Sequence, residues 1–122
     1  MRILICGSRY DIDEDKVRQI IEDIVHNNPD EEYMHGGAVG VDSMADSILK
    51  SHGITPEVVK PDYELHGNYA PLERDNRMVD VADEIHVLWN GRSRGSQYVM
   101  RYAKAHGKAT HMRVYDVSRK VE

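Results

Sequence analysis

The residues that most clearly suggest a binding site are three glycines at positions 36, 37 and 40, within the run His35–Asp42. Glycine lacks the Cβ atom that restricts the backbone, so it permits tight turns and the close approach of a ligand. The run lies between a short apolar segment and an amphipathic one, which predicts a turn that opens into a helix. Such a turn directs unpaired N–H groups and the positive end of the helix dipole at one point. The pattern predicts a site for a phosphate or another small anion, with an ordinary tight turn as the alternative.

Two other glycine-bearing segments could bind an anion. Gly7-Ser8-Arg9 combines a tight turn with a hydroxyl and a guanidinium, and arginine can hold a phosphate or carboxylate through two parallel hydrogen bonds. The run 90–96 (Asn-Gly-Arg-Ser-Arg-Gly-Ser) has the composition of an anion loop ahead of a helix, although Ser96 could serve only as the N-cap. Asp42, in the first turn of its helix, could either favour the helix dipole or bind a ribose hydroxyl.

A polar cluster at 74–78 supplies two cations, an amide and a carboxylate within about one helical turn. Arg74 and Arg77 are three residues apart, so both can lie on one helix face. A solvated charged face is the alternative interpretation. Asn76 fits that alternative less well, because asparagine is a poor helix former.

Several kinds of site have no support in the sequence. The seven histidines lack paired ligand spacing and a cysteine partner, so we expect no metal site. The run 36–40 is not followed by Lys-Ser/Thr, which argues against a Walker-type ATPase. Neither a nucleophile elbow nor a Ser-His-Asp context is present, so acyl transfer is not indicated.

Apolar spacing predicts strands that alternate with helices along the chain. Expected strands cover Arg2–Cys6, Glu32–His35, Thr55–Lys60, Glu84–Trp89 and Ala109–Val114. Expected helices cover Asp13–Asn27, a segment from Val41 closed at Gly53, Leu72–Val81 and Ser96–His106. The stretch Pro61–Pro71 shows no periodicity and is expected to be a surface excursion.

This order predicts an α/β fold: a single Rossmann-like, doubly wound domain over residues 1–122, with a mostly parallel sheet of about five strands. The core is expected over about 2–114, followed by a loose tail at 115–122. Six of the nine glycines then follow strands one, two and four, and therefore meet at one edge of the sheet; they are Gly7, Gly36, Gly37, Gly40, Gly91 and Gly95. This clustering favours a ligand site more strongly than any single motif does.

Composition limits the partners. Sixteen lysines and arginines stand against 21 aspartates and glutamates, and this net charge of −5 makes a nucleic-acid partner unlikely. The apolar runs are too short to cross a membrane, and no signal peptide is expected. A single cysteine, Cys6, excludes an internal disulfide and favours a reducing, cytoplasmic location.

Three spans together resemble a known group: residues 3–9, residues 35–42, and residues 70–78 continuing to 89–96. The chain resembles the YspA-like branch of the SLOG superfamily, Rossmann-like proteins that include the LOG phosphoribohydrolases and the DNA-processing protein DprA. The resemblance covers about residues 2–114 and implies a nucleotide or nucleotide-derived ligand at the carboxyl edge of the sheet; no cofactor is assigned. The residues that match its ligand-binding motifs are Gly7, Ser8, Arg9, Gly36, Gly37, Gly40, Asp42, Arg74, Asn76, Arg77, Gly91, Ser93, Gly95 and Ser96.

Two departures from the family pattern bear on catalysis. Val39 stands where the second loop of the family often has an arginine, and Val99 stands where the LOG enzymes have a glutamate. Cleavage of an N-glycosidic bond needs a carboxylate. Glu73 and Asp75 are the candidates that could supply one from elsewhere in the chain, and the catalytic residues stay unassigned.

The sequence therefore favours a small binding domain, or sensor, for a nucleotide or ADP-ribose-like ligand. The alternative is a nucleoside or nucleotide N-glycosidase, or a deoxyribosyltransferase-type enzyme, that uses the same pocket. Related domains tend to assemble, so a homo-oligomer with a contact at Pro61–Pro71 is also an expectation.

Overall fold

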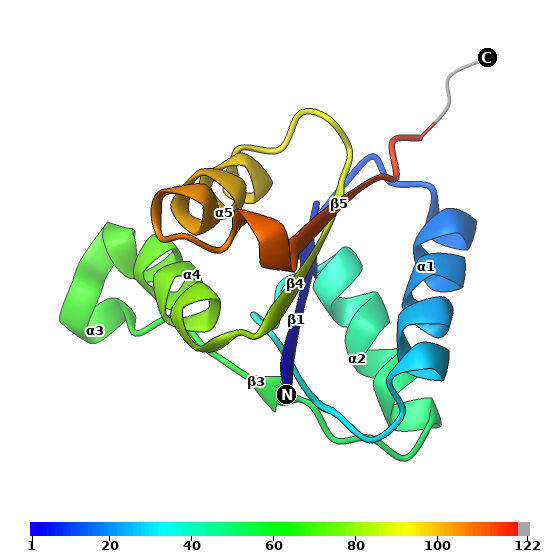
Figure 1. Cartoon of the computed structure of the whole chain (residues 1–122). Helices are drawn as coiled ribbons and strands as arrows, with labels where there is room; N and C mark the ends of the chain where they lie inside the picture. Colours follow the sequence, from blue (N-terminus) through cyan, green and yellow to red (C-terminus); the bar gives the residue numbers. More distant parts are fainter. Residues whose placement is uncertain (120–122) are drawn as a thin grey trace.

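A five-stranded parallel sheet forms the centre of the molecule in the computed structural model, which describes residues 1–119. The strands lie in the order β3-β2-β1-β4-β5, and every neighbouring pair is parallel. Their bounds are β1 Arg2–Gly7, β2 Glu32–His35, β3 Glu57–Val58, β4 Glu84–Trp89 and β5 Met112–Asp116. The expected doubly wound α/β fold is confirmed (Figure 1).

Helices cover both faces of the sheet (Figure 1). Helices α1 (Glu14–Asn27) and α2 (Val41–Ser51) lie on one face, and α4 (Ala70–Val81) and α5 (Arg94–Ala105) lie on the other. A short helix, α3 (Tyr63–His66), and a 3₁₀ turn at Gly67–Tyr69 precede α4 away from the sheet. A second 3₁₀ turn, Ala109–His111, leads into β5.

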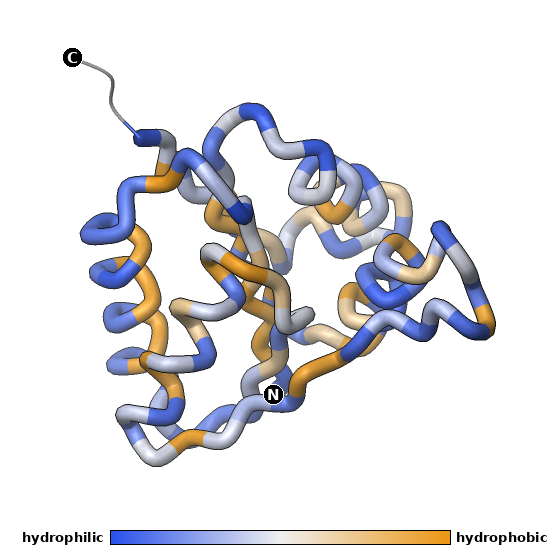
Figure 2. Tube along the Cα trace, turned by 180° about the vertical axis from the view of Figure 1, so that it is seen from behind, coloured by the Kyte–Doolittle hydropathy of each residue, from blue (hydrophilic) through white to orange (hydrophobic). Residues whose placement is uncertain are grey.

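The core has two halves because β1 is buried on both sides. Ile3 and Ile5 pack towards α1 and α2, whereas Leu4 and Cys6 pack towards α4 and α5. This burial explains why β1 reads as a continuous apolar run rather than as an alternating one. Figure 2 shows the same arrangement in α1, whose apolar stripe faces inward and whose polar side faces solvent.

The strand order reverses at β1: β2 and β3 are added on one side of it, and the chain then crosses to the other side to form β4. Strands β2 and β3 extend to one side of β1, while β4 pairs with its other edge, from Ile3 opposite Glu84 to Gly7 opposite Leu88. In open α/β sheets this switch point opens a crevice beyond the carboxyl ends of the strands. The loops that follow β1 and β4 meet there.

The stretch Pro61–Pro71 is mostly exposed, as expected of a surface excursion, but it contains helix. Asp62 caps α3 by accepting a hydrogen bond from the Leu65 N–H, and α4 begins at Ala70 rather than at about Leu72. Proline near the start of α4 fits, since the first helical N–H groups have no acceptor within the helix. Strand β3 is only two residues long.

The expected tail at 115–122 also contributes to the fold. Strand β5 continues to Asp116, the Val117 side chain is fully buried, and Ser118 forms an antiparallel bridge with Ile12. The remainder of that tail, 120–122, lies outside the described residues. Within the described part of the chain, every helix is too short or too polar to cross a membrane.

Candidate functional site

A cavity of about 530 Å³ opens at the switch point between β1 and β4. Its walls come from the loops after β1 and β4, the first turns of α2 and α5, and one side of α4. The lining residues are Cys6, Gly7, Ser8, Arg9, Tyr10, Asp11, Ala38, Asp42, Arg74, Asp75, Met78, Asn90, Arg92, Ser93, Arg94, Gly95, Ser96 and Val99.

A chain of three serine hydroxyls joins the loops after β1 and β4. The Oγ atoms of Ser8 and Ser93 are 2.8 Å apart, and Ser93 Oγ donates to Ser96 Oγ at 2.9 Å. Ser8 Oγ also accepts a hydrogen bond from the Asn90 N–H. Since Ser8 and Ser96 are buried, this chain fixes the two loops against each other.

The buried side chain of Asn90 shapes the loop after β4. Its Oδ1 accepts hydrogen bonds from the N–H groups of Arg92 and Ser93, at 2.8 and 2.9 Å, as in an Asx turn. Its Nδ2 donates to the carbonyl of Tyr10 in the neighbouring loop. Asn90 therefore holds both loops in place.

The glycine run after β2 is closed by Asp42. Asp42 Oδ2 accepts hydrogen bonds from the N–H groups of Gly36 and Ala38, at 3.0 and 3.3 Å. Burial raises the pKa of Asp42, whereas these backbone donors and the nearby His35 and Arg74 lower it. Much of the hydrogen-bonding capacity of Asp42 thus stabilises its own loop.

Arg74 anchors α4 to the same loop. Its Nη1 donates to the carbonyl of Gly36 at 2.6 Å, and its Nε donates to Asp75 Oδ1 at 2.9 Å. A Cβ at Gly36 would stand 2.7 Å from Arg74 Nη1, so the guanidinium fits only because this residue is glycine. Arg74 is buried, so its guanidinium holds α4 and the glycine run together and does not belong to a solvated charged face.

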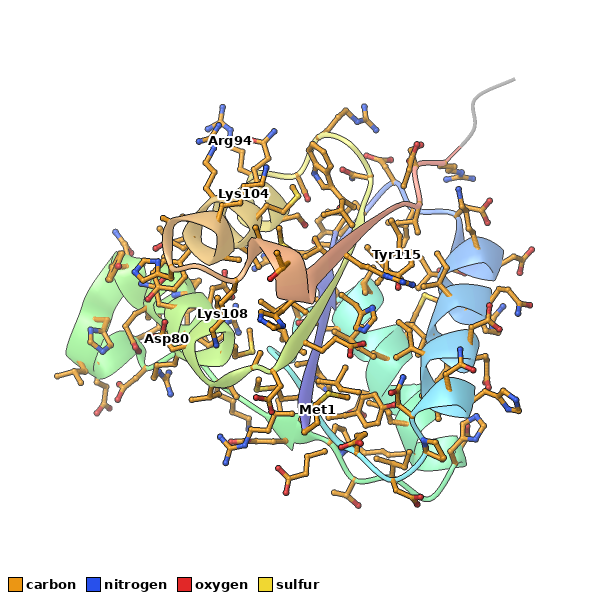
Figure 3. The ribbon with its side chains drawn as sticks, in the orientation of Figure 1. Met1, Asp80, Arg94, Lys104, Lys108 and Tyr115 are labelled. Atoms are coloured by element: carbon orange, nitrogen blue, oxygen red, sulfur yellow. The ribbon has the colours of Figure 1, made fainter. Side chains whose placement is uncertain are left out.

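The amino end of α5 is the part of the cavity best suited to an anion. The side chain of its N-cap residue, Ser93, accepts no hydrogen bond from the first N–H groups of the helix. The space beside Gly95 is open, because a Cβ there would meet no atom within 4 Å. Among residues 1–119, Arg9 and Arg94 form no side-chain hydrogen bond or ion pair, whereas Arg92 pairs with Asp11 at 3.3 Å. The first N–H groups of a helix carry partial positive charge, and Arg9 and Arg94 add positive charge to the lining of the same cavity. Figure 3 shows Arg94 extending from α5 into solvent.

Asp75 contributes a carboxyl group to the wall of the cavity on α4. Burial, with a smaller contribution from nearby Asp42, raises the pKa of Asp75 to about 6, although Arg74 and Arg9 act in the opposite direction. The Asp75 side chain is 14% exposed. The Asp75 carboxyl group therefore changes its protonation state near pH 6.

Substitution of Asp75 is expected to change how stability depends on pH. A carboxyl whose pKa is raised by folding favours the folded state at low pH, and this contribution is lost as pH rises from about 4 to about 6. Asp75→Asn keeps an oxygen for Arg74 but cannot ionise. The free energy of unfolding of the variant, relative to the natural protein, should increase across this range by up to about 3 kcal/mol. Urea unfolding at pH 4.5 and 7.5 measures the difference; an equal difference at both pH values contradicts the prediction.

Comparison with known proteins is consistent with this architecture. The family model described as "YspA, cpYpsA-related SLOG family" matches residues 1–66. The chain belongs to this SLOG family. The gene 61 protein of Mycobacterium phage D29 is 34% identical over 116 residues, which cover 87% of this chain and 90% of that protein. No solved structure matches the chain.

The structure gathers some of the motif residues of this SLOG protein and separates others. Those that line the cavity are Gly7, Ser8, Arg9, Asp42, Arg74, Ser93, Gly95 and Ser96, together with the candidate catalytic residue Asp75. Four glycines lie outside its lining: Gly36, Gly37, Gly40 and Gly91. Of these, Gly36 and Gly40 are required for loop packing, because a Cβ at either would clash with a neighbouring segment.

The other polar residues of α4 face away from the cavity. Glu73 pairs with Arg77 through both carboxylate oxygens, at 2.8 Å, and Arg77 also donates to the carbonyl of Lys60. Asn76 bonds the hydroxyls of Tyr69 and Tyr98. One turn of helix points its residues in different directions, so Glu73, Asn76 and Arg77 lie outside the cavity lining although they adjoin Arg74 and Asp75 in sequence.

Some lining residues were given no individual role from the sequence. Asn90 belongs to the predicted anion loop 90–96, and asparagine after a buried strand and before glycine is also a turn signal. The apolar floor formed by Cys6, Met78 and Val99 carries no such signal. Burial raises the pKa of the Cys6 thiol well above its ordinary value. Because the thiolate is the nucleophilic form, Cys6 contributes an apolar wall to the cavity rather than a nucleophile. Residues 1–119 hold no group of three or more potential metal ligands.

Proposed function

We propose that this SLOG protein is a binding module for a nucleotide or a nucleotide-derived, ADP-ribose-like ligand. The observation that carries the proposal is the amino end of α5, where Gly95 leaves open space in a cavity that Arg9 and Arg94 also line. Neither arginine side chain has a hydrogen bond or ion pair with any of the described residues. A phosphate in this space would accept hydrogen bonds from the helix N–H groups and from arginine. The apolar floor beneath it suits a base or a sugar face.

A ligand panel tests this proposal. AMP, ADP-ribose and inorganic phosphate are compared with adenosine, which lacks the phosphate, by thermal shift and isothermal titration calorimetry. We expect AMP and ADP-ribose to stabilise the protein by about 2.7 kcal/mol when present at 100 times the Kd. Adenosine should give much less stabilisation. Absence of binding by every phosphate-bearing probe to the folded protein would reject the proposal.

An N-glycosidase-type or deoxyribosyltransferase-type activity is the second candidate, because Asp75 lines the cavity with a pKa of about 6. A carboxyl in that range can give a proton to a departing base. Against it, Val99 forms the wall at the position where LOG enzymes have a glutamate. Release of free base from a nucleotide panel, lost in Asp75→Asn and retained in Glu73→Gln, would support this activity; no release after long incubation would dismiss it.

A further inference from the structure

The lining of the cavity carries charges of both signs. Arg9, Arg94 and the amino end of α5 contribute positive charge, whereas Asp42 on α2 and Asp75 on α4 contribute two carboxyl groups. The two carboxyl groups are close enough for Asp42 to raise the pKa of Asp75. A ligand that carried only negatively charged groups would donate no hydrogen bond to these carboxyl groups. The cavity therefore fits a ligand that also brings hydrogen-bond donors.

Asp75 has one oxygen available for such a donor. Its Oδ1 accepts from Arg74 Nε, which orients the carboxyl group, and Oδ2 forms no hydrogen bond with any of the described residues. No buried side-chain oxygen or nitrogen of the described residues lacks a hydrogen-bond partner, so Oδ2 keeps contact with solvent at the cavity wall. A ligand donor can take the place of that solvent, and a hydrogen bond to a charged group is stronger than one to a neutral group.

Asp42 is less suited to this role. Its Oδ2 already accepts from two backbone N–H groups, and those bonds hold the glycine run in place. Asp75 extends from a regular helix, and its orientation is fixed by a neighbouring guanidinium. The sequence left open whether Asp42 binds ribose, and the geometry moves that role to Asp75.

We propose that Asp75 determines sugar specificity, and that the site selects ligands with a ribose 2′,3′-diol, whose hydroxyls donate to Asp75 Oδ2. This inference rests on the proposed nucleotide-binding function and adds the sugar class to it. A hydroxyl is the donor that a nucleotide presents beside its phosphate. A 2′-deoxy sugar removes one donor, so a deoxyribonucleotide leaves the carboxylate less well satisfied.

Calorimetry with paired probes tests the inference at pH 7.5. The natural protein should bind AMP roughly 10- to 100-fold more tightly than 2′-deoxy-AMP, as expected for a hydrogen bond to a charged group. In Asp75→Asn this preference should fall to less than about threefold. Glu73→Gln is the matched control: it changes a carboxylate on the same helix that faces away from the cavity, and the preference should remain.

A pH series provides a second readout that needs no variant. The charged groups that act on Asp75 are Arg74 on α4, Arg9 after β1 and Asp42 on α2. Ribose donors favour the ionised carboxylate, so the preference for AMP should be largest above pH 6 and smaller at pH 5.

The outcomes separate the two proposals. Equal binding of AMP and 2′-deoxy-AMP would overturn the role of Asp75 and leave the binding function intact. A preference that persisted unchanged in Asp75→Asn would overturn it as well. Failure of both nucleotides to bind would reject the binding function for AMP, and the sugar specificity with it.

Discussion

Gly40→Ala is expected to destabilise the protein by about 3–5 kcal/mol. A Cβ at residue 40 would lie 2.5 Å from the carbonyl oxygen of Ser8 and 2.6 Å from the backbone of Arg9. Gly40 also has a φ of +81°, which strains any L residue with a side chain. Neither backbone segment can move freely, because the Val41 N–H donates to the Ser8 carbonyl at 3.1 Å. Urea unfolding of the variant measures the loss.

Gly53→Ala is the matched control for this prediction. Gly53 has a similar φ of +75°, but a Cβ there would meet no atom within 4 Å. The control therefore carries the conformational strain without the clash, and should lose only about 1 kcal/mol. Equal losses in the two variants would show that loop packing against Gly40 is not tight.

Gly95→Leu is expected to weaken AMP binding at least about 100-fold, which corresponds to about 2.8 kcal/mol. The added side chain would extend into the cavity at the amino end of α5, where the phosphate is proposed to bind. Folding should not suffer, because leucine is a better helix former than glycine by roughly 0.8 kcal/mol. Calorimetry with AMP and urea unfolding of the same sample measure the two effects.

This combination of weaker binding and retained stability separates a ligand site from a structural glycine. Ala105→Leu adds a leucine at the other end of α5, outside the cavity, and should leave AMP binding unchanged. If Gly95→Leu bound AMP as tightly as the natural protein, the phosphate would not occupy the amino end of α5.

The fold was predictable because its signals are local. The continuous apolar run of β1 and the helical spacing of Val17, Ile21 and Ile24 each mark an element without reference to the rest of the chain. The right-handed connections of parallel strands then limit the arrangement of the sheet. The region around α3 was missed because a helix of four residues, stabilised by one cap at Asp62, is too short to show periodicity.

The site was predictable only in outline. Turn residues after β1, β2 and β4 indicated the sheet edge at which the cavity lies, because parallel strands end on the same side. The role of each residue within the site could not be predicted from the sequence. Gly40 allows a neighbouring backbone to approach, and Arg74 holds a loop through buried hydrogen bonds, although both resemble ligand-binding residues in sequence.

The sequence alone determined the elements of this protein and the edge where they meet, because hydrophobic period and turn chemistry act over a few residues. Only the tertiary structure decided which polar groups face the cavity, because that depends on how α4 is rotated against the sheet. That rotation buries Arg74 and directs Asp75 into the cavity, while Glu73 and Arg77 pair with each other outside it. Neighbours in sequence thus acquire opposite roles through packing.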